Sequence, residues 1–398
     1  MFNKRFKTIC VFMTVAAMTG VLASCVFGAA TTGVLTGCVF NSFGWKETGV
    51  PMPPPTQINQ RVVAISSTYM TSYAITEDGS LWAWGFNENI GREGKHQLNP
   101  IKIMDDVAIT SGRYVVTADG TLWELVSSRW HGDGTTEDWP SPVEILHDVV
   151  AVSSSHAVTS DGKLWGWGYN ERGRVGDGTT EDRASPVMVM DDVIAVSFSS
   201  AITSDGVLWV WGENYRGRLG NGTTGGNKLS PVPIMEDVIA VSSDDHTMAI
   251  TSDGTLWGWG YNNCGQLGIG SRRTRTRPTR VMSDVVAVAA YGTRTFAITS
   301  DGKLWGWGSN ANGELGDGTT RDRRRPILIM EDVVSVAPGS SHTLAITSDG
   351  SLWAWGKSDF GQLGIGTPRG EIERTMTDRG IRPAAWLSPV LVLEYVPD

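Results

Sequence analysis

The sequence contains few of the side chains on which catalysis and metal binding usually depend. It has six histidines and four cysteines in 398 residues. Three of the cysteines lie within the first 38 residues, so only Cys264 falls in the rest of the chain. Neither a disulfide framework nor a cysteine–histidine metal site is predicted. Because no Ser-His-Asp or Cys-His arrangement is indicated, we predict no catalytic residues, no metal, no cofactor and no enzyme.

A surplus of basic residues is also missing. The formal net charge is −9, and loss of a leader carrying Lys4, Arg5 and Lys7 would remove three positive charges and bring it to −12. An acidic chain of this kind has no overall electrostatic attraction to nucleic acid. We therefore expect partners of another class.

The first 45 residues have the layout of an export signal, with basic residues followed by an uncharged apolar stretch. The stretch contains Leu22-Ala23-Ser24-Cys25, which resembles the lipobox of bacterial lipoproteins. That resemblance implies lipidation of Cys25 and cleavage before it. A second, poorer-placed copy ends at Cys38. Ordinary cleavage near Ala30 and retention as an uncleaved membrane anchor remain open alternatives.

These features predict the domain organisation. We expect a signal peptide over 1–24, a linker over 25–60 that is proline-rich at 51–55, and a single folded domain over 61–398. The protein is expected outside the cytoplasm, either anchored to the cell membrane by lipid or secreted.

What the sequence has in quantity is glycine and tryptophan, 48 and 17 residues, and many of them recur in a repeat. The pattern Asp-Gly-x-Leu-Trp occurs seven times at intervals of 41 to 48 residues. In six copies the pattern extends to Trp-x-Trp-Gly. The aspartates are Asp78, Asp119, Asp161, Asp205, Asp253, Asp301 and Asp349. Asp-Gly between two apolar runs predicts a β-hairpin, and a repeated period of this length predicts a propeller or solenoid.

One repeat unit, residues 185–222, can be interpreted strand by strand. A strand begins at Pro186, a short apolar strand follows at 193–196, and two more flank the turn Ser204-Asp205-Gly206. Four short antiparallel strands describe one propeller blade. Two tryptophans spaced two apart share a strand face, and we interpret them as core residues between blades. The sequence therefore predicts an all-β fold with seven blades.

The fullest copies of the repeat, at 253–268 and 301–316, read Asp-Gly-x-Leu-Trp-x-Trp-Gly-x-Asn-x-x-Gly-x-Leu-Gly. This pattern resembles the RCC1 (regulator of chromosome condensation) repeat, including the strand-borne histidines at 156, 246 and 342. We interpret these histidines as one structural position in three blades. The resemblance extends from about residue 55 to 398 and implies a seven-bladed ring whose chain ends meet in one blade.

The manner of closure can also be predicted. An additional copy of the proline-initiated strand stands at Pro389-Val390-Leu391-Val392-Leu393, whereas Thr56-Gln57-Ile58-Asn59 reads as a poor strand. We predict that this C-terminal strand pairs into the N-terminal blade begun by Val62, which would remove a free sheet edge. The second repeat lacks its second tryptophan, so its blade is expected to be the most eroded.

Two kinds of loop offer candidate sites. The sequence Gly-Asp-Gly-Thr-Thr recurs, but it supplies one carboxylate per loop, which indicates a turn and not calcium binding. Two neighbouring loops carry arginines that superpose in the repeat and suit anionic groups. These candidate binding residues are Arg273, Arg275, Arg277, Arg321, Arg323, Arg324 and Arg325. The alternative is a solvated rim balanced by Asp322, Glu331 and Asp332.

The leading functional hypothesis is a non-enzymatic binding, adhesion or scaffold propeller outside the cytoplasm. Its partner would be a protein, an anionic polysaccharide or a lipid headgroup on one propeller face, and the propeller is expected to be a monomer. The alternative is a regulator of a GTPase or another enzyme, since the best-known member of the resembled family exchanges guanine nucleotide on a small nuclear GTPase. A hydrolase or lyase acting at the rim is disfavoured, because histidine and carboxylate clusters are missing.

Overall fold

The computed structural model describes residues 56–58, 60–86, 96–125, 142–366, 376–377, 380–381 and 385–395. No helix within these ranges is long and apolar enough to cross a membrane. The predicted signal peptide, Cys25 and the proline-rich stretch at 51–55 lie outside the described residues.

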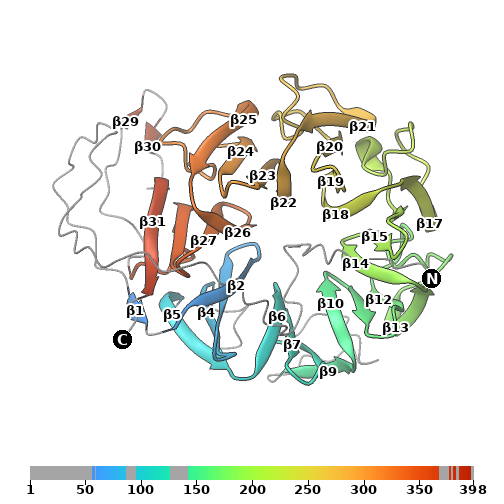
Figure 1. Cartoon of the computed structure of the whole chain (residues 1–398), viewed down its shortest axis with the longest axis horizontal. Coiled ribbons are helices and arrows are strands. Elements are labelled where there is room, and N and C mark those ends of the chain that lie inside the picture. The colour runs from blue at the N-terminus through green and yellow to red at the C-terminus, as the bar shows by residue number, and fades with distance from the viewer. Residues whose placement is uncertain are drawn as a thin grey trace, which may run out of the picture.

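The chain forms a ring of seven β-sheets, the blades of a propeller (Figure 1). Each blade has four antiparallel strands, which we number from the innermost, first strand to the outermost, fourth strand. Blade 1 consists of β2 (Val62–Ser67), β3 (Thr71–Thr76), β4 (Leu81–Gly85) and β5 (Gln97–Met104). Blade 2 consists of β6 (Val107–Ser111), β7 (Tyr114–Thr117), β8 (Leu122–Glu124) and β9 (Val143–Leu146). Blade 3 consists of β10 (Val149–Ser153), β11 (His156–Thr159), β12 (Leu164–Gly168) and β13 (Arg183–Met190). Blade 4 consists of β14 (Val193–Ser197), β15 (Ser200–Thr203), β16 (Leu208–Gly212) and β17 (Lys228–Met235). Blade 5 consists of β18 (Val238–Ser243), β19 (His246–Thr251), β20 (Leu256–Gly260) and β21 (Arg275–Met282). Blade 6 consists of β22 (Val285–Tyr291), β23 (Arg294–Thr299), β24 (Leu304–Gly308) and β25 (Arg323–Met330). Blade 7 consists of β26 (Val333–Pro338), β27 (His342–Thr347), β28 (Leu352–Lys357) and β31 (Ala385–Tyr395). The predicted seven-bladed propeller is confirmed.

The Asp-Gly turn is held by the same hydrogen bonds in each blade. In blade 5 the indole Nε1 of Trp257 donates to Oγ1 of Thr251 at 3.2 Å, and this hydroxyl donates to Oδ1 of Asp253 at 2.7 Å. The same oxygen of Asp253 accepts the backbone N–H of Thr255 at 3.0 Å. The hydrogen bond from Thr251, followed by that from Thr255, lowers the pKa of Asp253. The first tryptophan, the threonine and the aspartate of the repeat therefore form one structural unit.

The blades are offset by one strand from the sequence repeat. The proline-containing strand β21 pairs with β20 of the preceding repeat, with Leu256 opposite Met282, and so forms the fourth strand of blade 5. The strand that follows, β22, opens blade 6. The crossing between them is fixed at Val285, whose N–H donates to the carbonyl of Gly254 in the Asp-Gly turn at 3.0 Å.

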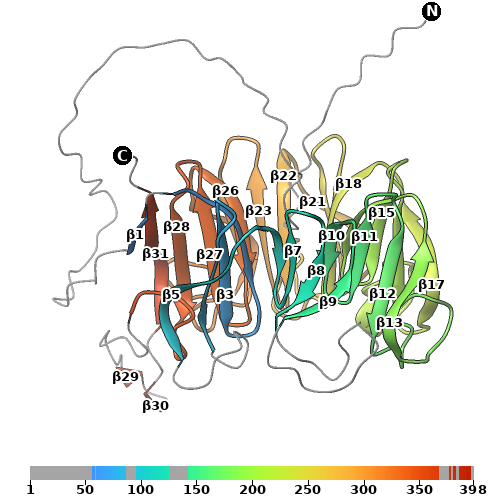
Figure 2. The ribbon, with the colours of Figure 1, turned by 90° about the horizontal axis from the view of Figure 1, so that it is seen from below.

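The ring is closed by the C-terminal strand, as predicted, but in a different blade. β31 pairs with β28 as the fourth strand of blade 7, and blade 1 is already complete with β5. The prediction that β31 pairs into the blade of Val62 is wrong, because the offset assigns each proline-initiated strand to the blade before it. The segment β1 (Thr56–Ile58), predicted to be a poor strand, pairs in parallel with the outer edge of β31. The first and the last described strands, β1 and β31, therefore lie side by side in blade 7 (Figures 1 and 2).

The second tryptophan of the repeat joins neighbouring blades by a hydrogen bond from its indole N–H to a loop carbonyl of the preceding blade, a contact that we call the latch. In blade 6, Nε1 of Trp307 donates to the carbonyl of Gln266 in the loop of blade 5 at 2.8 Å. Oγ1 of Thr295 donates to the same carbonyl at 2.7 Å and accepts a 2.6 Å hydrogen bond from Nε2 of His246. Since the threonine hydrogen is already donated, the histidine must be the donor.

The closing seam carries the same latch. Nε1 of Trp84 and Oγ of Ser72 in blade 1 donate to the carbonyl of Gln362 in blade 7 at 3.0 and 2.7 Å. His342 lies 2.9 Å from the Ser72 hydroxyl through Nε2. Blades 7 and 1 thus meet through the contacts that join internal blades, as expected of a ring without a free edge.

The three histidines do not share one position, which corrects the sequence interpretation. His246 and His342 lie opposite Gly260 and Gly356, the glycines that end the third strands, whereas His156 lies opposite Gly166, two residues earlier. Because β11 is two residues shorter than β19 and β27, His156 lies two residues further along its strand than the other two histidines do. All three rings are buried, and desolvation lowers their pKa values to about 4, 4 and 3 for His156, His246 and His342. They are uncharged structural groups near neutral pH.

Blade 2 is the most eroded blade among the described strands, in agreement with the sequence prediction. Its third strand β8 has three residues, and the buried Glu124 stands where other blades have glycine, alanine or valine. Nε of Arg113 lies 2.8 Å from this carboxylate. The next blade's Trp167 donates to the hydroxyl of Tyr114 at 3.4 Å, where other blades supply a loop carbonyl.

Candidate functional site on the loop face

The ring has two chemically different faces. The loops that join third to fourth strands lie on one side, which we call the loop face, and the Asp-Gly turns lie on the other, the turn face. The loop face is the lower side of the ring in Figure 2, where β29 (Met376–Thr377) and β30 (Gly380–Ile381) lie. The latch carbonyls belong to these loops, so the packing of the blades also fixes the position of the loops.

The seven arginines predicted to form a binding patch all lie on the loop face of blades 5 and 6. Arg275 and Arg323 begin β21 and β25 and pair with Gly260 and Gly308, so the predicted superposition of the two loops is correct. Arg275 and Arg323 are half-buried. The remaining predicted arginines are exposed: Arg273, Arg277, Arg321, Arg324 and Arg325.

Arg323 has a structural partner. Its Nε donates to Oδ2 of Asp317 at 2.6 Å, and the same pairing joins Arg183 to Asp177 in blade 3 at 2.5 Å. Burial opposes ionisation of Asp317, but hydrogen bonds from Thr319 and Arg323 lower its pKa overall. Arg323 therefore stabilises its own loop and is removed from the set of free cations.

Arg275 lacks this partner because Ile269 stands where blade 6 has the aspartate. Within the described residues no carboxylate lies within 4 Å of the guanidinium of Arg275. The arginine of blade 5 therefore keeps its charge available, although it occupies the same position in the repeat.

Arg277 and Arg325 cover the seams between blades. A Cβ added to Gly222 would lie 2.6 Å from Nη2 of Arg277, and one added to Gly270 would lie 2.8 Å from Nη2 of Arg325. In blades 4 and 7 a serine occupies this position, since Ser230 lies over Gly178 and Ser388 over Gly318. Since serine suffices there, the arginines are not required for packing.

Of the three acidic neighbours expected to balance the arginines, only Asp322 lies on the loop face. Glu331 and Asp332 follow the last residue of β25 and lie on the turn face, an eight-residue strand away from Arg323. Eight strand residues span roughly 26 Å, whereas the Debye length at physiological ionic strength is about 8 Å. The third acid, Asp322, is paired with Arg272 at 3.0 Å. Among the described residues, the loop face of blades 5 and 6 is therefore locally cationic on an acidic protein.

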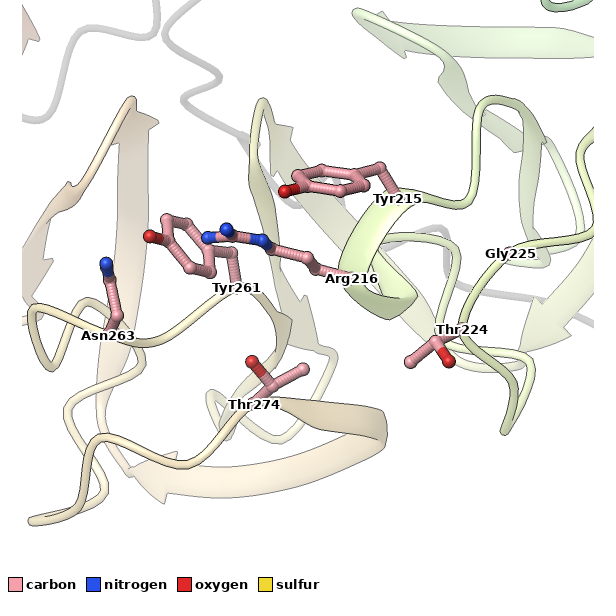
Figure 3. A pocket seen from close by; sticks show the side chains of 7 residues that line it. All are labelled: Tyr215, Arg216, Thr224, Gly225, Tyr261, Asn263 and Thr274. Atoms are coloured by element: carbon pink, nitrogen blue, oxygen red, sulfur yellow. The ribbon is translucent and has the colours of Figure 1, made fainter.

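A cleft of about 650 Å³ lies on the same face between blades 4 and 5 (Figure 3). The short 3₁₀ turn η2 (Tyr215–Gly217) supplies one wall, and Tyr261 stands on the other. The guanidinium carbon of Arg216 lies 3.8 Å from the ring centroid of Tyr261 and 4.7 Å from that of Tyr215. Two aromatic rings thus flank one planar cation. The remaining lining residues are Thr224, Gly225, Asn263 and Thr274.

Sequence reasoning missed this cleft. Tyr215 and Tyr261 are 46 residues apart in the chain and meet only because blades 4 and 5 are neighbours. The available signal was the departure of Tyr215-Arg216 from the residues that other repeats carry at the same place, such as Ala311-Asn312.

Comparison with known proteins supports the fold. The RCC1-like domain matches residues 193–392, which is just over half of the chain. The chain belongs to the RCC1-like domain family. A regulator of chromosome condensation (RCC1) repeat also matches residues 161–203. No curated protein matches this RCC1-like sequence.

Solved structures share the RCC1-like fold. Yeast RCC1 (Prp20), in a crystal structure with Kap60, has 18% identity and a TM-score of 0.54, covering 83% of this chain and 74% of that chain. Prp20p of Saccharomyces cerevisiae, from a study of its binding to Gsp1p and histones, has 19% identity and a TM-score of 0.52, covering 83% and 76%. Human WBSCR16 has 20% identity and a TM-score of 0.52, covering 86% and 84%. At these identities the likeness concerns the fold alone.

The aspartate of the recurrent Gly-Asp-Gly-Thr-Thr loop in this RCC1-like propeller makes structural contacts. Oδ1 of Asp177 accepts the N–H and hydroxyl of Thr179 at 3.0 and 2.9 Å and the side-chain amide of Asn170 at 3.0 Å. Within the described residues no group of three or more histidine, cysteine or acidic side chains is arranged to hold a metal. Cys264 is a free thiol, as predicted, and burial raises its pKa. Asp177 therefore has a structural role, and Cys264 belongs to no metal-binding group within the described residues.

Proposed function

We propose that this protein is a non-enzymatic binding propeller whose loop face recognises an anionic partner, foremost an acidic protein surface. The observation that carries the proposal is the set of arginines without a carboxylate partner on the loop face of blades 5 and 6: Arg273, Arg275, Arg277, Arg321, Arg324 and Arg325. Within the described residues none of them forms an ion pair.

Charge arithmetic supports an electrostatic contribution. The chain is acidic overall, so a cationic patch attracts anions locally while the rest of the surface repels them. Such a patch steers a partner into one orientation and contributes to specificity and association rate. Guanidinium groups also bind carboxylate and phosphate through paired hydrogen bonds.

The location proposed is outside the cytoplasm, anchored by lipid on Cys25 or secreted. Its support is the basic start, the apolar stretch and Leu22-Ala23-Ser24-Cys25 in the sequence. Membrane fractionation with labelled fatty acid tests this location. Cys25→Ala is expected to lose the label, and unlabelled wild-type protein in the cytoplasm would contradict the location.

The binding proposal is tested with defined probes and charge-matched variants. The probes are poly-L-glutamate, polygalacturonate, and vesicles with and without anionic lipid. Arg277→Ser and Arg325→Ser combined remove two loop-face charges and introduce the residue found at this position in blade 4. The control, Lys163→Thr with Lys303→Thr, removes two turn-face charges and introduces the residue found at that position in blade 5.

We expect poly-L-glutamate to bind the wild type and the turn-face control equally, and to bind the loop-face variant several-fold more weakly. Equal loss in both variants would mean that only net charge matters, and equal retention would reject the patch. Tighter capture of polygalacturonate or anionic vesicles than of poly-L-glutamate would replace the protein partner with that ligand.

The alternative is regulation of a GTPase, which family membership favours in general terms. Prp20p was studied for binding to Gsp1p and histones. If the same activity applies here, the chain should accelerate nucleotide release from a small GTPase of its own source. Unchanged release with a panel of such GTPases would exclude this role while leaving the binding proposal intact.

A further inference from the structure

The cleft between blades 4 and 5 contains an arginine in an unusual backbone conformation. Arg216 has φ 57° and ψ 24°. It is the one arginine among the non-glycine residues with positive φ in the described part of the chain. A left-handed conformation costs roughly 1–2 kcal/mol for an ordinary residue, and such residues concentrate at functional sites. The conformation places Arg216 at the mouth of the cleft, beside the neighbouring blade.

Two tyrosines hold the guanidinium plane. Tyr261 contacts it from blade 5, and Tyr215 flanks it from the same turn (Figure 3). An arginine stacked in this way loses little further side-chain freedom when it binds, because its fork is already oriented. Tyr215 is 52% exposed, so one side of the stack is open to solvent.

No acid among the described residues neutralises the charge of Arg216. The nearest acid in its loop, Glu213, is engaged by Arg172 and Arg174. Within the described residues Arg216 forms no ion pair. Desolvation opposes its charge, but hydrogen bonds with the side chains of Tyr261 and Tyr215 raise its pKa, so the guanidinium keeps its charge for an external anion.

We propose that this cleft, defined by Tyr215, Arg216 and Tyr261, is the anchoring pocket for a carboxylate side chain of an acidic peptide segment. A single guanidinium matches the single charge of a carboxylate, and no second cation lines the cleft as a phosphate dianion would favour. Arginine and tyrosine are also the residue types that dominate protein-binding hot spots. The inference rests on the proposed function, and it names the pocket and the chemical class of the partner.

The remaining geometry fits a peptide. The open cleft volume of about 650 Å³ accommodates a few side chains, and Thr224, Asn263 and Thr274 line it with hydroxyl and amide groups. Thr274 directly precedes Arg275, so the cleft adjoins the start of the arginine patch. An extended segment with several carboxylates could contact Arg216 and then the arginines of blades 5 and 6.

The test uses the full chain and fluorescein-labelled hexaglutamate, followed by fluorescence anisotropy at low ionic strength. Hexaglutamine and a labelled tetragalacturonate serve as the neutral peptide and the acidic sugar. Arg216→Gln removes the charge, and Arg216→Lys keeps the charge but removes the planar fork. Urea unfolding of each variant verifies that the ring remains folded.

We expect hexaglutamate to bind the wild type and hexaglutamine not to bind. Both Arg216→Gln and Arg216→Lys should weaken hexaglutamate binding about tenfold, because a point charge does not replace a stacked bidentate group. If Arg216→Lys bound hexaglutamate as tightly as the wild type does, positive charge alone would explain the binding, and the pocket would be rejected. Equal, Arg216-dependent binding of tetragalacturonate would reject the peptide assignment.

The two proposals fail in different ways. If the Arg216 variants bind like the wild type while the Arg277→Ser, Arg325→Ser variant does not, the patch stands and the pocket is rejected. If hexaglutamate does not bind the wild type at all, both are rejected.

Discussion

Replacement of Leu393 by alanine should strongly destabilise the ring. Leu393 is 1% exposed in β31 and belongs to a buried cluster that includes Val62 and Trp84 of blade 1 and Leu352 of blade 7. The substitution removes apolar contacts at the closing seam and leaves a cavity. A buried Leu→Ala change costs about 2–5 kcal/mol, and the shared cluster leaves little room for relaxation. We expect a loss of about 3 kcal/mol in the free energy of unfolding.

Urea unfolding monitored by tryptophan fluorescence measures this loss. Leu328→Ala in β25 is the matched control, since Leu328 lies in the fourth strand of blade 6 and is 45% exposed. Its expected cost is below about 1 kcal/mol. Equal, small effects of the two substitutions would show that β31 does not close the ring by packing against blade 1.

Three further predictions follow from the latch, the buried histidines and the arginines. Gly316→Ala should lower the free energy of unfolding by more than about 1 kcal/mol, since φ is +77° and the added Cβ would lie 2.8 Å from Nε1 of Trp355; an unchanged urea midpoint would contradict the packing. Because burial lowers the pKa of His342 to about 3, the unfolded chain binds a proton below about pH 6.5 that the folded chain does not. Stability should fall from pH 6.5 towards 4, less steeply in His342→Gln, and identical pH profiles would refute this. Arg277→Ser and Arg325→Ser should change the unfolding free energy by less than about 0.5 kcal/mol, as expected for exposed sites without partners.

The repeat predicted the fold, because each of its recurrent residues has a local structural task. The first tryptophan and the Asp-Gly pair form a hydrogen-bonded turn, and the second tryptophan binds the loop of the preceding blade. Such short-range patterns are visible in one sequence. The closing partner was predicted wrongly because periodicity does not indicate where a blade begins. That boundary depends on the backbone pairing of β20 with β21, which has no separate sequence signal.

The candidate site was only partly predictable. The superposition of the arginines followed from spacing, and the structure agrees with it. The pairing of Arg323 with Asp317, against the free Arg275 beside Ile269, was present in the sequence but needed the loop geometry to be recognised. The Tyr261–Arg216 stack depends on contact between blades and on a left-handed backbone, neither of which periodicity predicts.

The central claim is that the loop face, and not the turn face, meets the partner. Site-specific photo-crosslinking in the cell of origin tests it directly. A benzoylphenylalanine at position 324 probes the loop face, and one at position 331 probes the turn face of the same blade, since Arg324 and Glu331 are both exposed. We predict a discrete protein adduct from position 324 and none from position 331. An adduct formed only from position 331 would contradict the account.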